Sequence, residues 1–203
     1  VPPMTTTSTP TPTTWEDAAR AALADLKDSH TWVIPVLNGD EFTSRLNHIA
    51  DIAYDLAVGG RYARGLYSAF DNVAEVATYL GVDQGDDLIA LLVEKQKGYG
   101  PKNITKFGVK GIGIRLSDKA QRLLNLRSKG QDGNHDESVK DTVTDMLGYC
   151  VVGVMNEMGW MELPIEAPKP KRVYMPRSYI TYPIAADYAT RNPDSVVLVE
   201  VVA

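Results

Sequence analysis

The fold is decided by the stretch "VKDTVTDMLGYCVVGVMNEMGW", residues 139–160. Its apolar residues recur at helical spacing and cover more than one stripe: Val139, Val143, Met146, Leu147, Cys150, Val151 and Val154. A surface helix buries a single apolar stripe, whereas a helix that is apolar on most of its surface lies at the centre of a bundle. We therefore predict a mainly α protein with this segment as its central helix.

Helical periodicity also runs through five earlier segments, in which apolar residues stand three and four positions apart. These segments are residues 15–27, 39–60, 64–81, 84–100 and 114–130. The first follows Thr14, which we predict to be an N-cap with Asp17 three residues later. Residues 98–113 hold several glycines and are predicted to form a connecting loop. The pattern predicts a helical bundle of five to six helices with a Gly-rich connector.

The two ends of the chain differ from its helical middle. Residues 1–14 are almost entirely Thr and Pro, so they are predicted to be a disordered tail. Residues 161–203 are rich in Pro and Tyr and are predicted to form an extended C-terminal arm, with β-like segments at 178–189 and 195–203. Between the ends we place an N-terminal helical region at 15–87 and a second helical domain at 88–160.

Composition narrows the class of protein. Of 203 residues, 44% are hydrophobic and 23% are charged, as in ordinary globular domains. The net charge of -5 argues against a broad duplex-DNA surface, which is usually strongly basic. No apolar run approaches the roughly 20 residues that a membrane span needs. With Cys150 as the only cysteine, we expect a cytoplasmic protein.

Val1, with Met4 as an alternative start, favours a bacterial or phage gene, and for a phage gene the location is the host cytoplasm.

An acidic row lies on the predicted central helix. Glu137, Asp141 and Asp145 are spaced four residues apart and share one helix face. Like charges at this spacing repel each other, unless a cation such as Mg²⁺ lies between their oxygens. A solvated helix start explains Glu137 equally well, whereas Asp145 lies among apolar residues and needs a partner. Glu94 is a candidate fourth metal ligand, or else the partner of a nearby lysine.

A basic stripe lies on the preceding predicted helix. Arg115, Lys119 and Arg122 stand at i, i+4 and i+7 and share one face. Arg offers planar bidentate bonds to phosphate and Lys offers a point charge, so the stripe is a candidate phosphate site. A solvated charged face is the alternative. Tyr99, at the end of the segment before, either stacks on a base or fills the core at a helix end.

The order of these elements resembles a known family. Residues 88–158 are similar to the nucleotide modification associated domain family, found largely in phages and bacteria. The matching elements are Lys95 to Gly100, Asn103, Phe107-Gly108, Arg115, Asp118-Lys119, Arg122-Leu123, Glu137, Asp141, Asp145 and Tyr149. The resemblance implies a role in handling modified deoxynucleotides, in which Lys95, Tyr99 and Asn103 join the substrate contacts.

The helical layout also resembles the all-α, MazG-like nucleoside triphosphate pyrophosphatases. That resemblance implies a Mg²⁺-dependent hydrolase that converts a deoxynucleoside triphosphate to monophosphate and pyrophosphate. Glu94 would hold the metal together with the three acids of the central helix, and those three would be the catalytic carboxylates: Glu137, Asp141 and Asp145. It also implies a homo-oligomer, because related enzymes build their sites between subunits.

The acid spacing departs from the pattern of those enzymes. Glu137 and Asp141 are four residues apart rather than three, and Leu91 and Lys97 stand where a second acid near Glu94 is expected. This departure motivates the alternative of a non-catalytic nucleotide-binding or accessory protein. Such a protein would serve DNA modification or sequester a host signalling nucleotide.

Overall fold

The computed structural model describes residues 11–29, 37–59, 62–130, 137–167, 171–175, 191 and 195–199. The chain forms two compact units, Val1–Ile165 and Glu166–Ala203. The first unit contains the helices α1 (Trp15–Ser29), α2 (Gly39–Val58), α3 (Tyr62–Leu80), α4 (Asp86–Tyr99), α5 (Lys102–Thr105), α6 (Gly108–Ser128) and α7 (Glu137–Glu157). The mainly α bundle is therefore confirmed, with the one-turn α5 added to the six long helices found in the described residues. Most of the predicted tail, residues 1–10, lies outside the description.

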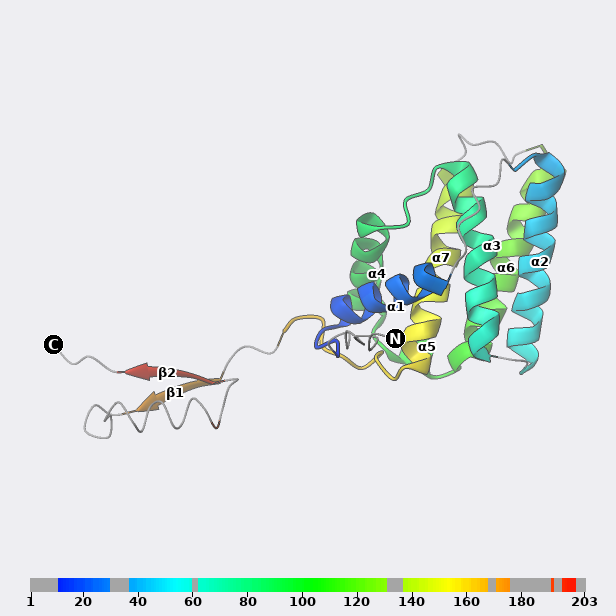
Figure 1. Ribbon diagram of the computed structural model, residues 1–203. Helices are drawn as coiled ribbons and strands as arrows, with labels where there is room; N and C mark the ends of the chain where they lie inside the picture. Colours follow the sequence, from blue (N-terminus) through cyan, green and yellow to red (C-terminus); the bar gives the residue numbers. More distant parts are fainter. Residues whose placement is uncertain are drawn as a thin grey trace, which may run out of the picture. The chain divides into compact units, whose positions relative to one another are not determined.

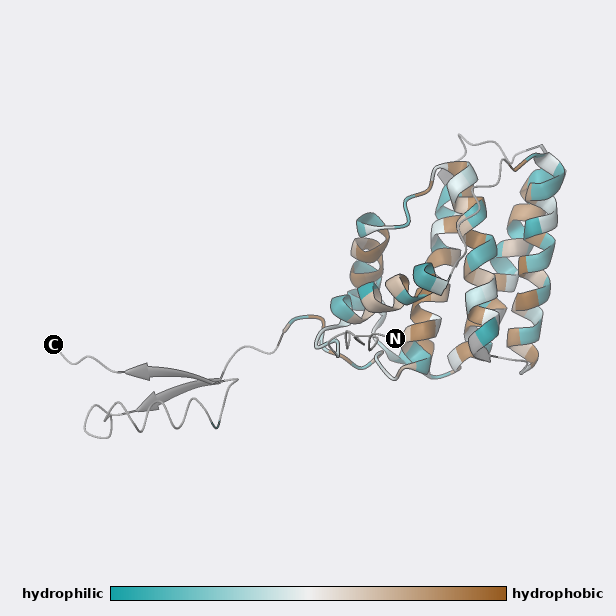
Figure 2. Cartoon of the chain, viewed as in Figure 1, coloured by the Kyte–Doolittle hydropathy of each residue, from teal (hydrophilic) through white to brown (hydrophobic). Residues whose placement is uncertain are grey.

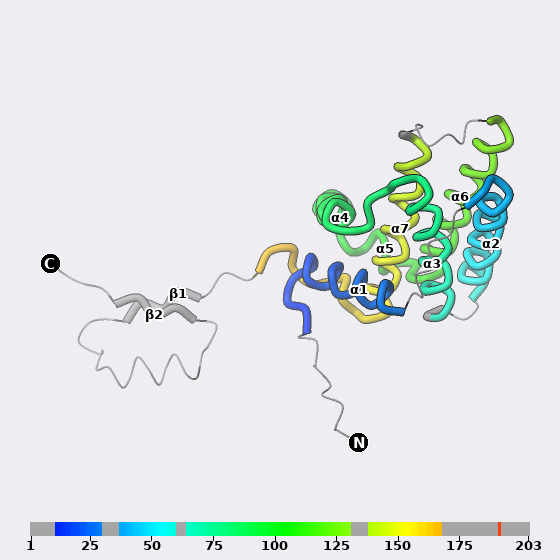
Figure 3. Tube along the Cα trace, turned by 45° about the horizontal axis from the view of Figure 1, so that its top comes forward, coloured from blue at the N-terminus to red at the C-terminus, as the bar shows by residue number. Residues whose placement is uncertain are grey.

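Within the first unit, α2, α3, α6 and α7 run side by side (Figure 1). α2 packs on α3 and α6, and α7 packs on the same two helices. α1 and α4 contact each other and α7 (Figure 3). The regions 15–87 and 88–160 thus contribute to one common core.

α7 is the central helix, as its apolar pattern predicts. It contacts α1, α3, α4, α5 and α6. Its side chains at Val143, Leu147, Cys150, Val151 and Met155 are fully buried. Figure 2 shows hydrophobic and hydrophilic residues alternating along the surrounding helices, as one-sided burial requires. The position of α7 decides which of its polar residues meet α4 and α6, and so it builds the candidate site.

Reciprocal side-chain caps start the first two helices. Thr14 Oγ1 accepts a hydrogen bond from the Asp17 N–H at 3.1 Å, and the Asp17 carboxylate accepts one from the Thr14 N–H at 3.2 Å. Asn38 and Glu41 form the same arrangement at α2. A cap of this kind contributes about 1 kcal/mol. The predicted N-cap at Thr14 is confirmed, and it fixes Trp15 in the first turn of α1.

The predicted loop at 98–113 is wrong over most of its length. α4 continues to Tyr99, α5 fills residues 102–105 and α6 begins at Gly108. Packing explains why glycines stand inside a helix here. A Cβ on Gly113 would lie 2.6 Å from Ala57 N and 2.7 Å from Ala53 O of α2. Glycine costs about 1 kcal/mol in a helix interior, and the close crossing of α2 and α6 offsets that cost.

The second unit contains a small parallel sheet. β1 (Lys171–Met175) pairs with β2 (Ser195–Val199), with Lys171 opposite Ser195 and Met175 opposite Val199. The β-like pattern that begins at Ser195 is therefore confirmed as a strand, while the segment 178–189 lies outside the described residues. Across the described ranges, no helix combines the length and the apolar character that a membrane crossing requires.

Candidate functional site

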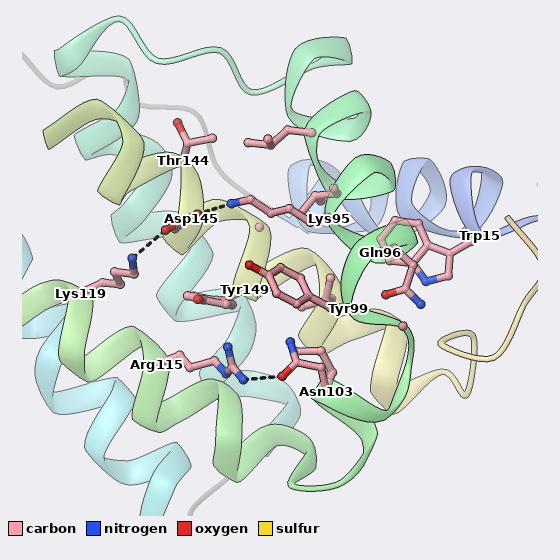
Figure 4. Close-up of a pocket in the computed structure, with 16 residues that line it drawn as sticks. Trp15, Lys95, Gln96, Tyr99, Asn103, Arg115, Lys119, Thr144, Asp145 and Tyr149 are labelled. Carbon is pink, nitrogen blue, oxygen red and sulfur yellow. Dashed lines mark hydrogen bonds and ion pairs between the residues drawn. The ribbon is translucent and has the colours of Figure 1, made fainter. Parts of the chain in front are cut away.

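A cavity of about 380 Å³ opens between α4, α6 and α7 (Figure 4). This volume falls in the range of small-molecule sites, roughly 300–1,000 Å³. Trp15 of α1 and Ile104 of α5 complete its wall. The lining mixes leucine and valine side chains with a cluster of cationic and aromatic ones. Clefts of this composition are the usual sites of ligand binding.

Helical spacing explains how the cluster is assembled. Residues four apart lie on one face of a helix, and each of the three helices presents a pair of charged or aromatic residues at this spacing to the cavity. The pairs are Lys95 and Tyr99 on α4, Arg115 and Lys119 on α6, and Asp145 and Tyr149 on α7. Gly148 brings α7 close to α4, since a Cβ there would lie 2.8 Å from Leu92 Cδ2.

Asp145 lies between two ammonium groups. Lys119 Nζ donates to Asp145 Oδ2 at 2.6 Å, and Lys95 Nζ donates to Oδ1. Burial raises the pKa of Asp145, but the hydrogen bonds from Lys119 and Lys95 outweigh burial and hold that pKa below its ordinary value. The side chain of Asp145 is 22% exposed. The carboxylate is therefore ionised at neutral pH and ties α7 to both α4 and α6.

Arg115 is held in place on the other side of the cavity. Its Nη2 donates to Asn103 Oδ1 at 2.9 Å, and its guanidinium lies 5.7 Å from the centre of the Tyr149 ring. Figure 4 shows Arg115 and Asn103 joined below Tyr149 and Tyr99. A guanidinium carries five N–H donors, so most of its hydrogen-bonding capacity remains for a ligand.

The pocket is positively charged although the whole chain is acidic. Three cations line it against one carboxylate, a local formal charge of +2, while the chain carries -5. A concave basic site on an acidic protein attracts anions locally without attracting nucleic acid over a wide surface. The charge pattern therefore points to a small anionic ligand.

Of the predicted acidic side chains that the structure describes, Glu94 and Asp141 do not line this pocket. Glu94 is 76% exposed and its carboxylate lies 3.6 Å from Lys97 Nζ, while Asp141 is exposed. The side chain of Glu137 lies outside the description. Asp145 is the member of the predicted metal set that lines the cavity. Among described residues, no group of three or more His, Cys, Asp or Glu side chains is arranged to hold a metal ion.

The predicted substrate contacts divide into two groups. Lys95, Tyr99, Asn103, Arg115 and Lys119 line the cavity, as does Asp145. Arg122 is exposed, donates to Ser138 Oγ at 3.2 Å and does not line the cavity. The alternative of Tyr99 as a core residue does not hold, because its side chain is 70% exposed at the rim.

Sequence reasoning missed Trp15 and Gln96, which also line the pocket. Trp15 reads as an apolar anchor of α1, and nothing in its local pattern points to a site 80 residues further along the chain. Gln96 carried a usable signal. It follows Leu88 and Leu92 at four-residue spacing, so it is a polar residue on the buried face of α4.

The arrangement suits ligand binding better than proton transfer. A carboxylate with a lowered pKa between two ammonium groups is a weak base, because a general base works best with a pKa near the working pH. The three cations, in contrast, suit contact with an anion, and the exposed ring of Tyr99 lies beside them. Comparisons of the chain with models of known families, with curated proteins and with solved structures find no match.

Proposed function

We propose that the protein binds a deoxynucleotide or a related nucleotide in the pocket between α4, α6 and α7. The observation that carries the proposal is the convergence of Lys95, Lys119 and Arg115 on one cavity. Phosphate oxygens match this set, because charge-assisted hydrogen bonds from Lys and Arg are shorter and stronger than neutral ones. Asp145 keeps the two lysines in position and offsets their mutual repulsion while the pocket is empty.

The aromatic residues favour a nucleotide over a simple phosphate. Tyr99 stands exposed at the rim, and Tyr149 lies against Arg115 within the pocket. Stacking of a base on an aromatic side chain contributes about 1–3 kcal/mol. The cations would hold the phosphates and the tyrosines would hold the ring. The resemblance of residues 88–158 to the nucleotide modification associated domain family agrees with this proposal.

Binding without hydrolysis is the version that the geometry favours. A Mg²⁺-dependent pyrophosphohydrolase needs carboxylate oxygens that are free to ligate the metal. Both oxygens of Asp145 accept hydrogen bonds from lysines, and Glu94 and Asp141 do not line the pocket. The hydrolase remains the second candidate, favoured by the single observation that Asp145 of the predicted acidic row reaches the cavity.

Calorimetry on the full chain tests the binding proposal. Deoxynucleoside mono-, di- and triphosphates are titrated in EDTA and then in Mg²⁺. We expect binding in EDTA, and we expect Lys119→Met to weaken it by about tenfold or more, since a charge-assisted hydrogen bond contributes about 1.5–3 kcal/mol. Lys110→Met is the matched control, because Lys110 lies exposed on the same helix and does not line the pocket.

The same samples separate the two versions of the proposal. Products are resolved by ion-exchange chromatography. Monophosphate and pyrophosphate released in Mg²⁺ and absent in EDTA would establish the hydrolase. Binding without release would leave the non-catalytic version. An absence of binding by the wild-type protein, or an equal loss in Lys110→Met and Lys119→Met, would refute the assignment of the pocket.

A homo-oligomer is part of the proposal. Tyr54 and Val58 on α2 and Ile114 on α6 are large apolar side chains that remain more than half exposed. Their sequence neighbours Ala53, Ala57 and Gly113 meet where α2 crosses α6, so the three exposed residues flank one crossing. A second copy of the chain would cover them. Light scattering should give a dimer or larger, and Val58→Glu should reduce it to a monomer.

We place the protein in the cytoplasm, where nucleotides are available.

A further inference from the structure

Two polar side chains at one end of the pocket have no hydrogen-bond partner among the described residues. Trp15 is 1% exposed, and its indole Nε1 finds no acceptor within the described part of the chain. Gln96 is 8% exposed, and its side-chain amide makes no hydrogen bond to any described residue. Both residues line the pocket. Buried polar groups are nearly always paired, so each exception calls for an explanation.

Neither residue is placed there by a loose backbone. Trp15 opens α1, where its own N–H donates to Pro164 O at 2.7 Å and the Thr14–Asp17 cap holds the helix start. Gln96 lies on the buried face of α4 with Leu88 and Leu92. An apolar side chain in place of Trp15 would pack without the penalty of an unpaired polar group. The fold alone therefore does not account for the indole N–H of Trp15, and the unpaired amide of Gln96 in the same pocket is available to a ligand.

Their position within the cavity suggests what they contact. In Figure 4, Trp15 and Gln96 are drawn on the far side of Tyr99 from the Lys119–Asp145 pair. A nucleotide whose phosphates lie on the cations and whose ring passes Tyr99 would bring the outer edge of its base to this end. The edge of a base carries hydrogen-bond donors and acceptors, which are the partners that the two residues lack.

We infer that Trp15 and Gln96 recognise the edge of a pyrimidine base, an inference that rests on the proposed function. The indole contributes one donor, and the Gln amide contributes a donor and an acceptor. The matching ligand edge offers two acceptors and one donor. Thymine and uracil present O2, N3–H and O4 there, and cytosine presents O2, N3 and its amino group. The Watson–Crick edge of guanine offers one acceptor and two donors, and that of adenine offers one of each.

Calorimetry with deoxynucleoside monophosphates tests the inference on the full chain. The probes are dTMP, dUMP, dCMP, dAMP and dGMP, with deoxyribose 5-phosphate as the ligand that lacks a base. We expect the pyrimidine nucleotides to bind at least tenfold more tightly than the purine nucleotides and the sugar phosphate. A site with buried hydrogen-bonding groups rejects a ligand that leaves them unpaired.

Gln96→Met is the decisive variant, because it keeps the length of the side chain and removes the amide. It should lose the preference for pyrimidines while the unliganded protein melts at the same temperature or higher. A residue with a structural role only would instead lower the melting temperature. Gln121→Met, at an exposed position of α6, is the matched control and should change neither property.

Trp15→Phe provides a second test with a direct readout. The chain has three Trp residues, and this variant identifies the Trp15 indole N–H signal in a ¹⁵N–¹H spectrum. That signal should shift on addition of dTMP and stay in place on addition of deoxyribose 5-phosphate. Where Trp15→Phe is unstable, Trp32→Phe and Trp160→Phe assign the other two signals, and the Trp15 signal in the wild-type spectrum is identified by elimination.

The outcomes separate this inference from the proposed function. If the protein binds purine and pyrimidine nucleotides with equal affinity, the base-recognition role of Trp15 and Gln96 is wrong and the nucleotide pocket stands. The same conclusion follows if Gln96→Met keeps the preference for pyrimidine nucleotides. A wild-type protein that binds neither nucleotides nor deoxyribose 5-phosphate would overturn the proposed function and the inference together.

Discussion

Lys119 and Asp145, which both line the pocket, form an ion pair of 2.6 Å between Nζ and Oδ2. This ion pair links α6 to α7. Lys95 of α4 binds the other oxygen of the same carboxylate. One side chain thus connects the three helices that form the site. We expect Asp145 to stabilise the pocket, because it pairs both lysines, and to lower the affinity for anions, because it reduces the local positive charge.

Asp145→Asn should destabilise the protein and leave anion binding intact or stronger. Loss of the carboxylate leaves Lys95 and Lys119 facing each other, and we expect a cost of about 1–2 kcal/mol for this partly exposed pair. The local formal charge rises by one unit, which favours phosphate. Urea unfolding measures the first effect and nucleotide titration the second.

The hydrolase version predicts a different result for the same variant. If Asp145 ligates Mg²⁺, Asp145→Asn should abolish turnover and weaken the Mg²⁺-dependent part of binding. Glu94→Gln serves as the control, because Glu94 is exposed and does not line the pocket. A loss of nucleotide binding in EDTA for Asp145→Asn would contradict the binding version.

Acid should remove the stabilising effect of Asp145. The folded state holds the pKa of this carboxyl below its ordinary value, so the unfolded chain takes up its proton more readily. The contribution of Asp145 is complete above the unfolded pKa of about 4 and is lost as the pH falls through the lower pKa of the folded state. The difference in unfolding free energy between wild type and Asp145→Asn should be constant from pH 7 to about 5 and shrink below about 4. A difference that grows on acidification would contradict the ion-pair assignment.

Helical periodicity was sufficient to predict the bundle and much of the pocket. The all-round apolar pattern of residues 139–160 identifies α7 as the central helix, and four-residue spacing places Arg115 and Lys119 on one face. Both inferences depend on short-range geometry, which the order of residues determines directly.

Contacts between distant segments were beyond such reasoning. Trp15 and Gln96 line the same pocket only because α1 packs on α4 and α7. The glycines of α6 were read as a loop because their helix propensity is poor, and the approach of Ala53 and Ala57 that requires Gly113 is visible only in three dimensions. Arg122 shares the spacing of the basic stripe, yet it binds Ser138 outside the pocket.

Gly113→Ala should destabilise the protein although alanine is the better helix former. The added Cβ would lie within 2.7 Å of backbone atoms of Ala53 and Ala57, which can move only if α2 shifts. Overpacking of this kind costs about 1–3 kcal/mol. Gly98→Ala in α4 is the matched control, because its added Cβ would have no atom of a described residue within 4 Å beyond its chain neighbours and the nearby backbone of α4. The free energy of unfolding of this control should rise by up to about 1 kcal/mol.

Urea unfolding of Gly113→Ala and Gly98→Ala measures both effects. A stabilised Gly113→Ala would show that α2 and α6 do not cross closely.

Cys150 should report on the opening of the helical core. It is the single cysteine of the chain, and its side chain is fully buried on α7. Burial raises the pKa of its thiol, with a further contribution from Asp71, so the reactive thiolate is scarce as well as inaccessible. Labelling with a chromogenic disulfide at pH 8 should be at least about a thousandfold slower in buffer than in denaturing urea, if the reaction requires unfolding of a domain with ordinary stability.

A saturating nucleotide that binds the pocket should slow the labelling of Cys150 further, because binding to the folded state lowers the population of open states. Rapid labelling of the native protein would show that α7 is not packed on all sides.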